Sequence, residues 1–293
     1  MLTKFVEIAA RHGSATGAPS TIPRLVVRSA VAPTGPIPAL FEPKFYLLLQ
    51  GAKRMTIGGA SFEVEPGTSA VASVGLPFTS EVIEASATVP YLSVELKLDA
   101  GLLANLLLEL PERAVREARQ SGALSIEQID ESIVDPLGRL LGLLDTPSDI
   151  PVLAAQVERE LYYRLLAGPL GSRMRQVGSH SARFGQIKKA AEWIAENADQ
   201  SMSVEWLSAH VGMSVTSFHR HFKAVTAHTP LAYQRCIRLL DARRRLAAGP
   251  YSVTETAFAS GYASASQFSR EYKRAFGISP VRDAASSRRS KPL

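Results

Sequence analysis

The 293-residue chain is long enough for two domains, and its 46% hydrophobic content is that of an ordinary globular protein. No apolar run approaches the ~20 residues of a membrane span, and the N-terminal segment MLTKFVEIAARHG lacks a signal-peptide pattern. These features argue against a membrane or secreted protein, so we expect a cytoplasmic one. With Cys236 as its one cysteine, the chain has no internal disulfide.

The net charge of +6 is unevenly distributed along the chain. Residues 183–293 hold 17 Lys and Arg against 8 Asp and Glu, a balance of +9, whereas residues 1–182 have a balance of −3. This asymmetry is typical of a module that binds a polyanion, joined to an effector domain.

The first third of the chain predicts an extended arm followed by an antiparallel barrel or sandwich. Residues 1–40 are rich in Pro, Gly, Ser and Thr, with one short strand expected at Leu25–Arg28. From residue 44 to 98, apolar and polar residues alternate, and turn residues recur every eight to ten positions. Inward apolar side chains of these strands could line a small cavity for a mostly apolar ligand: Tyr46, Leu48, Phe62, Val64, Val94 and Leu96.

The sequence of this region offers few residues for a metal site or a catalytic site. There is no histidine between Gly13 and Ser179, so the barrel has no His-based metal site. The alternation places most strand carboxylates on a solvated face, and no Ser/His/Asp order or phosphate-binding glycine loop is present. We therefore expect no cofactor, no metal and no enzymatic activity.

Three helices are predicted to follow the barrel. The first covers Asp99 to Leu110, the second begins at Ser125 with Gln128 completing a capping box, and the third runs from Pro151 to Ala167. Their leucine stripes are wider than one small barrel requires. They therefore pack on each other and the barrel, or they form the seam of a homodimer.

The C-terminal part holds two copies of one pattern, from Ser203 to Pro230 and from Ser252 to Pro280. Each copy predicts a short helix, a turn at a glycine and a second helix capped by Ser214 or Ser264. Glu255 should complete a capping box with Ser252, and Gln267 one with Ser264. Two such repeats indicate a pair of helix-turn-helix units, at residues 203–224 and 252–276, joined by a helix near Leu231 to Ala247.

The second helix of each unit is amphipathic. The stripes predicted to be buried are Phe218, Phe222 and Val225 in one unit and Phe268, Tyr272 and Ala275 in the other. The opposite faces combine small polar groups with an arginine and a lysine, as a helix that reads the major groove does. The predicted DNA-binding residues are Thr216, Ser217, His219, Arg220, Lys223, Ser266, Gln267, Ser269, Arg270 and Lys273.

The tandem pattern, ending in FSREYKRAFGISP, resembles the DNA-binding region of the AraC/XylS family of bacterial transcription regulators. The resemblance implies that both recognition helices enter successive major-groove segments on one face of the duplex. Ala227 departs from the family, which usually has glycine there (compare Gly277). If this position needs a positive φ, alanine costs roughly 1 kcal/mol.

The N-terminal segments FEPKFYLLLQGAKR and VERELYYRLLAGPLG are similar to one cupin-like domain type of the same family. The resemblance thus covers about Ile22 to Arg282. It implies an α+β chain, in which a cupin-like antiparallel β-barrel with appended helices precedes an all-α domain of two helix-turn-helix units. We expect the divisions to fall at residues 1–98, 99–178 and 179–293.

These features predict a sequence-specific regulator of transcription that binds double-stranded DNA and responds to a small-molecule effector. RNA polymerase is a further partner to expect. Two alternatives stay open from the sequence: an architectural DNA-binding protein without a ligand, and a cupin-type enzyme with a DNA-binding tail. The absent histidines argue against the enzyme.

Overall fold

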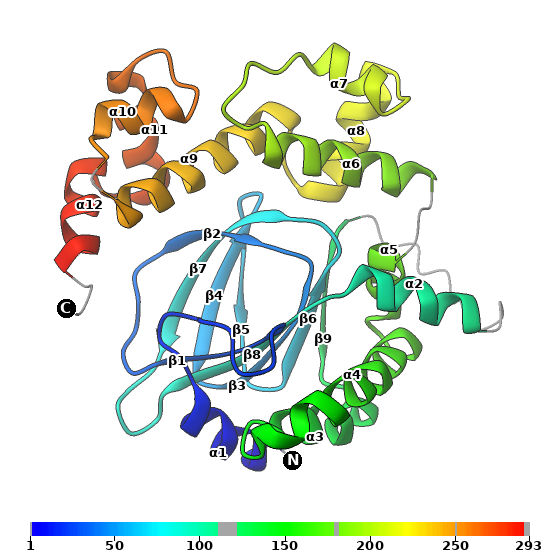
Figure 1. Ribbon diagram of the computed structural model, residues 1–293. Coiled ribbons are helices and arrows are strands. Elements are labelled where there is room, and N and C mark those ends of the chain that lie inside the picture. The colour runs from blue at the N-terminus through cyan, green and yellow to red at the C-terminus, as the bar shows by residue number, and fades with distance from the viewer. Residues whose placement is uncertain (1, 111–121, 179–181, 250, 290–293) are drawn as a thin grey trace.

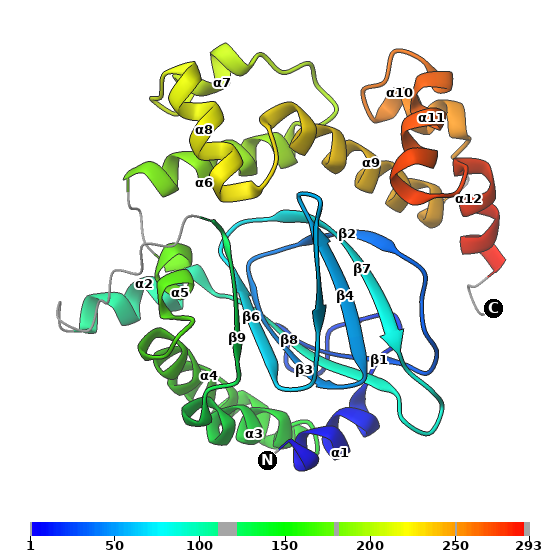
Figure 2. The same ribbon diagram turned by 180° about the vertical axis from the view of Figure 1, so that it is seen from behind.

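The computed structural model describes residues 2–110, 122–178, 182–249 and 251–289. Figure 1 shows a β-barrel in the middle, with helices packed against one side and an all-helical C-terminal unit on the other. The reverse view in Figure 2 shows the same three layers. None of the described helices is long and apolar enough to cross a membrane.

Two antiparallel sheets form the barrel. Strands of the first sheet, in spatial order, are β1 (Leu25–Ala30), β8 (Tyr91–Lys97), β3 (Lys44–Gln50), β6 (Thr68–Ala72) and β9 (Leu124–Gln128). Strands of the second sheet are β2 (Ile37–Phe41), β7 (Leu76–Glu84), β4 (Ala52–Ile57) and β5 (Ala60–Val64). The predicted strand at Leu25–Arg28 is thus confirmed, and the arm supplies β2 as well.

The first sheet is buried on both faces. Phe45, Leu47 and Val94 face outward into one apolar cluster with the N-terminal helices, whereas Tyr46 and Leu48 face the barrel interior. Strands buried on both sides read as continuous apolar runs, as the sequence FYLLL does. Alternation alone therefore could not tell which set of side chains points inward.

Five helices cover the outer face of the first sheet and the adjoining edge of the barrel: α1 (Thr3–His12), α2 (Ala100–Glu109), α3 (Val134–Gly142), α4 (Ile150–Ala167) and α5 (Gly171–Gly178). The expected first and third helices are confirmed as α2 and α4. Asp99 caps α2 by accepting a hydrogen bond from the backbone N–H of Leu102 at 2.9 Å. Helix α1 lies in a segment expected to be extended, where Phe5 and Ile8 bury an apolar face.

The helix predicted to begin at Ser125 is present only from Val134 onward, as α3, and its predicted start is wrong. Leu124–Gln128 is strand β9, which pairs with the free edge of β6, Ala70 lying opposite Ile126. The unpaired edge of β6 offers backbone hydrogen bonds that outweigh the local capping pattern. The sheet thus takes a strand from beyond residue 98, where we expected it to end.

The C-terminal unit contains seven helices in its described part: α6 (Ala182–Glu196), α7 (Val204–His210), α8 (Val215–Thr226), α9 (Pro230–Ala248), α10 (Val253–Ala259), α11 (Ala265–Phe276) and α12 (Pro280–Arg289). Helix α9 confirms the expected connecting helix. Its first half contributes Tyr233 and Ile237 to one core, and its second half contributes Ala242 and Leu246 to another. Each helix-turn-helix unit therefore has its own core on one shared helix.

Candidate DNA-binding interface

Each unit starts its helices with a serine cap and turns at a glycine. The hydroxyls of Ser214 and Ser264 accept backbone N–H groups of their helices at 3.4 and 3.5 Å. Gly212 and Gly261 have φ angles of +70° and +76°, a region in which side chains other than glycine are strained. The predicted helix-turn-helix geometry is present in both copies.

One of the two predicted capping boxes is confirmed. Ser252 accepts the N–H of Glu255 at 3.1 Å, and the Glu255 carboxylate accepts the N–H of Ser252 at 2.8 Å. Gln267 makes no such return bond to Ser264; its side-chain NH2 group donates a hydrogen bond to Glu271 at 3.2 Å.

The recognition helices α8 and α11 are anchored by aromatic residues. Phe218 and Phe222 are fully buried, with ring centroids 5.4 Å apart, and Phe268 and Tyr272 repeat the arrangement at the same distance. The predicted stripe is inexact at its end: Ala275 is exposed, and Phe276 packs against the core instead. Tyr272 also donates a hydrogen bond to Asp283 of α12 at 2.7 Å.

The predicted DNA-binding residues all lie away from these cores. Seven are exposed and three are half-buried, the latter being Ser217, His219 and Ser269. Among the described residues, the arginines and lysines of these faces, Arg220, Lys223, Arg270 and Lys273, form no ion pair with a carboxylate. Four cations without counter-charges therefore project from two matched helices, an arrangement suited to a polyanion.

Arg238 of α9 connects the two units. Its guanidinium donates to the carbonyls of Ala198 and Gln200 before the first unit and to that of Gly261 in the turn of the second. A Cβ placed on Gly261 would lie 2.0 Å from the carbonyl oxygen of Asp199, so the turn of the second unit touches the segment that leads into the first. Arg238 was not predicted, because its neighbours in the sequence do not distinguish it from the other arginines of α9.

The barrel contacts the first unit through backbone and side-chain atoms. The hydroxyl of Tyr233 donates to the carbonyl of Gly75 at 2.8 Å. The N–H of Ala123, just before β9, donates to the carbonyl of Val225 near the end of α8 at 3.0 Å. The barrel is therefore joined directly to helix α8 and to helix α9 of the helical unit.

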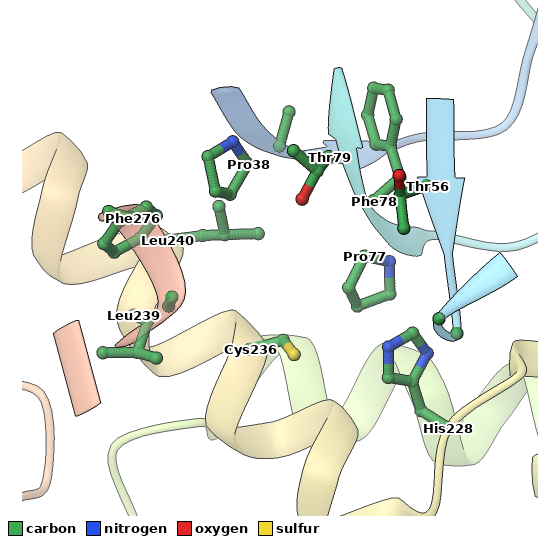
Figure 3. Close-up of a pocket in the computed structure, with 14 residues that line it drawn as sticks. Pro38, Thr56, Pro77, Phe78, Thr79, His228, Cys236, Leu239, Leu240 and Phe276 are labelled. Atoms are coloured by element: carbon green, nitrogen blue, oxygen red, sulfur yellow. The ribbon is translucent and has the colours of Figure 1, made fainter. Parts of the chain in front are cut away.

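An interdomain pocket of about 230 Å³ lies between the barrel and α9 (Figure 3). Pro77 and Phe78 line it from β7, and His228, Cys236 and Leu240 line it from the helical unit. Burial raises the pKa of the Cys236 thiol, which keeps it protonated and unreactive. Cys236 itself is half-buried.

The six expected ligand-pocket residues do not lie together. Tyr46, Leu48 and Val64 belong to the interior cluster of the barrel, with Phe62 packed against it. Val94 and Leu96 lie on the outer face of the first sheet, and their placement in a pocket is wrong because helices α1 and α3 cover that face.

A different set of residues surrounds a second space of about 230 Å³, here called the barrel cavity. Its charged residues are Arg28, Lys44, Lys53 and Glu95. The inward position of Lys53 could have been predicted from the sequence, because Lys53 is two residues from Met55 on β4 and therefore points to the same face of the strand. Among the described residues, no group of three or more His, Cys, Asp or Glu side chains could hold a metal ion.

Both halves of the chain match known protein families. A model of the AraC-type transcriptional regulator N-terminus matches residues 21–173, and one of a helix-turn-helix domain matches residues 207–284. The HTH-type transcriptional activator RhaS of Salmonella schwarzengrund is 28% identical over 155 residues, which are 52% of this chain and 55% of RhaS. The chain thus spans about half the length of the curated relatives it matches.

Solved structures of ToxT from Vibrio cholerae share the fold. ToxT with a bound unsaturated fatty acid has a TM-score of 0.55 and 10% identity, covering 89% of this chain and 94% of ToxT. ToxT bound to (E)-4-(8-methylnaphthalen-1-yl)but-3-enoic acid has a TM-score of 0.58 and 11% identity, covering 89% and 99%. Likeness at these identities concerns the fold alone.

Proposed function

Because the chain belongs to the AraC-type transcriptional regulators, we propose that it binds a specific DNA operator with both recognition helices at once. The observation that carries this proposal is the pair of matched helix faces, each with an unpaired arginine and lysine, fixed to one another through Arg238. Arginine can bond bidentately to guanine, and lysine neutralises phosphate.

The spacing of the two units supports simultaneous binding. Helix α9 has 19 residues, which corresponds to roughly 28 Å of rigid spacer at 1.5 Å per residue. Successive major-groove segments on one face of B-DNA are about 34 Å apart. Two recognition helices held at the ends of such a spacer fit this repeat better than two independent DNA contacts.

Selection from a random DNA library tests the proposal. The full chain should enrich one sequence containing two conserved segments about one helical turn apart. Its affinity for that duplex should exceed that for scrambled DNA by at least ~1,000-fold. Enrichment of no common sequence, with equal affinity for all duplexes, would favour the architectural alternative instead.

We further propose that a small molecule bound at the N-terminal domain alters DNA binding. Support comes from the contacts of Tyr233 and Ala123, which join the barrel to the first helix-turn-helix unit. ToxT, which has this fold, has been crystallised with an unsaturated fatty acid. A ligand changes the outcome only if it binds the two arrangements of the domains differently, and this interface is where they would differ.

The remaining partners stay predictions. A homodimer would use the exposed apolar residues of the N-terminal helices, such as Leu108 and Val152, which are 86% and 64% exposed. Binding to RNA polymerase, a cytoplasmic location and the absence of enzymatic activity rest on the family. A division at residue 98 separates β9 from its sheet, so the barrel extends beyond it. The division at residue 178 stays a prediction, and it adjoins residues 179–181, outside the described part.

A further inference from the structure

The barrel cavity has a charge imbalance among buried groups. Glu95, at the centre of β8, accepts hydrogen bonds from Arg28 at 2.7 Å and from Lys44 at 2.6 Å. Both cations therefore share one carboxylate. Burial alone would raise the pKa of Glu95, but Lys44 and Arg28 outweigh burial and lower it, so Glu95 is ionised.

Lys53 is a third cation in the same cavity and has no carboxylate of its own. Its side chain enters from β4 in the opposite sheet, and the residue is 6% exposed. In the described part of the chain its ammonium has no hydrogen bond or ion pair, and lies 5.1 Å from the ring centroid of Tyr46 and 5.7 Å from that of Phe78. Three cations thus face one anion, which leaves the cavity with a net charge of about +2.

A buried ammonium without a counter-ion is costly to keep. Burial lowers the pKa of Lys53 to about 8, with Lys44 and Arg28 adding to the effect and Glu95 opposing it. At neutral pH the ammonium is therefore still mainly charged. A bound anion would supply the missing partner and return the pKa toward its ordinary value.

The rest of the lining limits the size and shape of such an anion. Ile37 and Ala39 of β2 and Val82 of β7 are apolar, Ser29, Thr34 and Ser80 add hydroxyl groups, and the cavity volume is about 230 Å³. Hydroxyls at the back of the barrel interior, those of Tyr46 and Tyr91, already bond to each other at 3.0 Å. The space thus suits a compact body with a single anionic end.

We propose that the barrel cavity binds a small organic carboxylate, whose charged end pairs with Lys53 and whose apolar body packs against β2. This deepens the proposed ligand response and rests on it, because the site lies in the proposed sensory domain. Ala39 borders both the barrel cavity and the interdomain pocket, and Leu40 beside it packs against the core of the first helix-turn-helix unit. Movement of β2 is therefore the route from ligand to DNA-binding unit.

The test uses the full chain and matched probe pairs. Straight-chain carboxylates of four to eight carbons and benzoate are each compared with their primary amides by calorimetry and thermal unfolding. At least one carboxylate should bind about tenfold to a hundredfold more tightly than its amide, since a charged hydrogen bond is lost in the amide. Equal binding of acid and amide, or binding of neither across the panel, would overturn the proposal.

Variants assign the effect to one residue. Lys53→Met keeps the length of the side chain without its charge and should remove the preference for the acid, and Lys53→Gln repeats the test should the first variant misfold. The control is Lys97→Met on β8, whose side chain is 65% exposed and lies 3.6 Å from Glu42; it should keep the preference. Retention of the preference in both Lys53 variants contradicts the assignment.

Specific DNA binding of the wild-type chain is measured in parallel, with and without the tightest-binding acid. Absence of specific binding in both conditions would count against the proposed function, whereas acid-over-amide preference reports on the cavity alone. The two proposals can therefore fail separately.

Discussion

Gly58 and Ala227 are in direct contact across the boundary between the barrel and the first helix-turn-helix unit. A Cβ built on Gly58 would lie 2.6 Å from the Cβ of Ala227. Gly58 is the tip of the β4–β5 hairpin, and Ala227 is the C-cap of recognition helix α8. The hairpin of the barrel thus touches the end of a helix that we propose reads DNA.

Ala227 has a φ angle of +62°, and among the described residues it is the one non-glycine residue with positive φ. The position at which the sequence departs from the family pattern does have a positive φ, so the condition for a strained alanine is met. Ala227→Gly should therefore raise the free energy of unfolding by about 1 kcal/mol, measured by urea denaturation. Ala155→Gly, on the exposed side of α4, should lower it by about the same amount, because glycine is a poor helix former. A loss of stability in both variants would contradict the strain at Ala227.

Gly58 and Gly59 form a matched pair for testing the interface. Both have positive φ, at +58° and +88°, so alanine strains the backbone at either position. Only a Cβ on Gly58 meets Ala227, whereas one on Gly59 meets nothing within 4 Å. Calorimetry of Gly58→Ala should show separate unfolding of the barrel and the helical unit, while Gly59→Ala should lose stability but keep their coupling. Identical transitions in the two variants would mean that this contact does not join the domains.

Arg220→Ala and Arg270→Ala should each relax base preference at a different position and cost about 1–3 kcal/mol of specific binding. Lys223→Ala should weaken binding to all sequences. It should also reduce the slope of the logarithm of the binding constant against the logarithm of salt concentration by about one. Arg244→Ala on α9, whose side chain is 77% exposed and pairs with Asp241, serves as the control and should change neither. Equal losses on specific and random DNA in both arginine variants would refute their base-reading roles.

Lys53→Met should stabilise the ligand-free chain at pH 7 by about 1–3 kcal/mol, since it removes a buried ammonium. The pKa of Lys53 is lowered from 10.5 to about 8 in the folded chain. Below pH 8 Lys53 is protonated in both the folded and the unfolded chain, so the full free-energy cost of burying its ammonium is present. Between pH 8 and 10.5 the folded chain releases it first, so the wild type gains stability relative to the variant as pH rises.

Urea unfolding of both proteins at pH 7, 8, 9 and 10 measures this difference. Taking the difference between the two proteins cancels the titration of groups that both contain. Four of these groups, Glu95, Lys44, Arg28 and Tyr91, line the same cavity as Lys53 and are present in both proteins. A stability gap that does not narrow above pH 8 would show that Lys53 is not a buried ammonium.

The helix-turn-helix units could be predicted almost completely from the sequence, because their information is local. Serine caps, turn glycines and the Phe218–Phe222 spacing each act within a few residues. Arg238 could not be predicted, since its partners lie far away in the chain at Ala198 and Gly261.

The barrel was harder to predict because its side-chain pattern depends on what covers each sheet. Val94 and Leu96 are apolar on account of helices α1 and α3, and Glu95 between them turns into the interior. Strand β9 likewise arises from pairing with β6, fifty residues or more away, against a local helix-capping pattern. Long-range contacts override local preference in both cases.

The central claim is that one chain reads two groove segments with two recognition helices. Hydroxyl-radical footprinting and guanine-methylation interference on the selected duplex test it most directly. We expect two protected major-groove segments about 34 Å apart on one face of the duplex, one lost in Arg220→Ala and the other in Arg270→Ala. Protection of a single isolated segment that both variants weaken alike would contradict it.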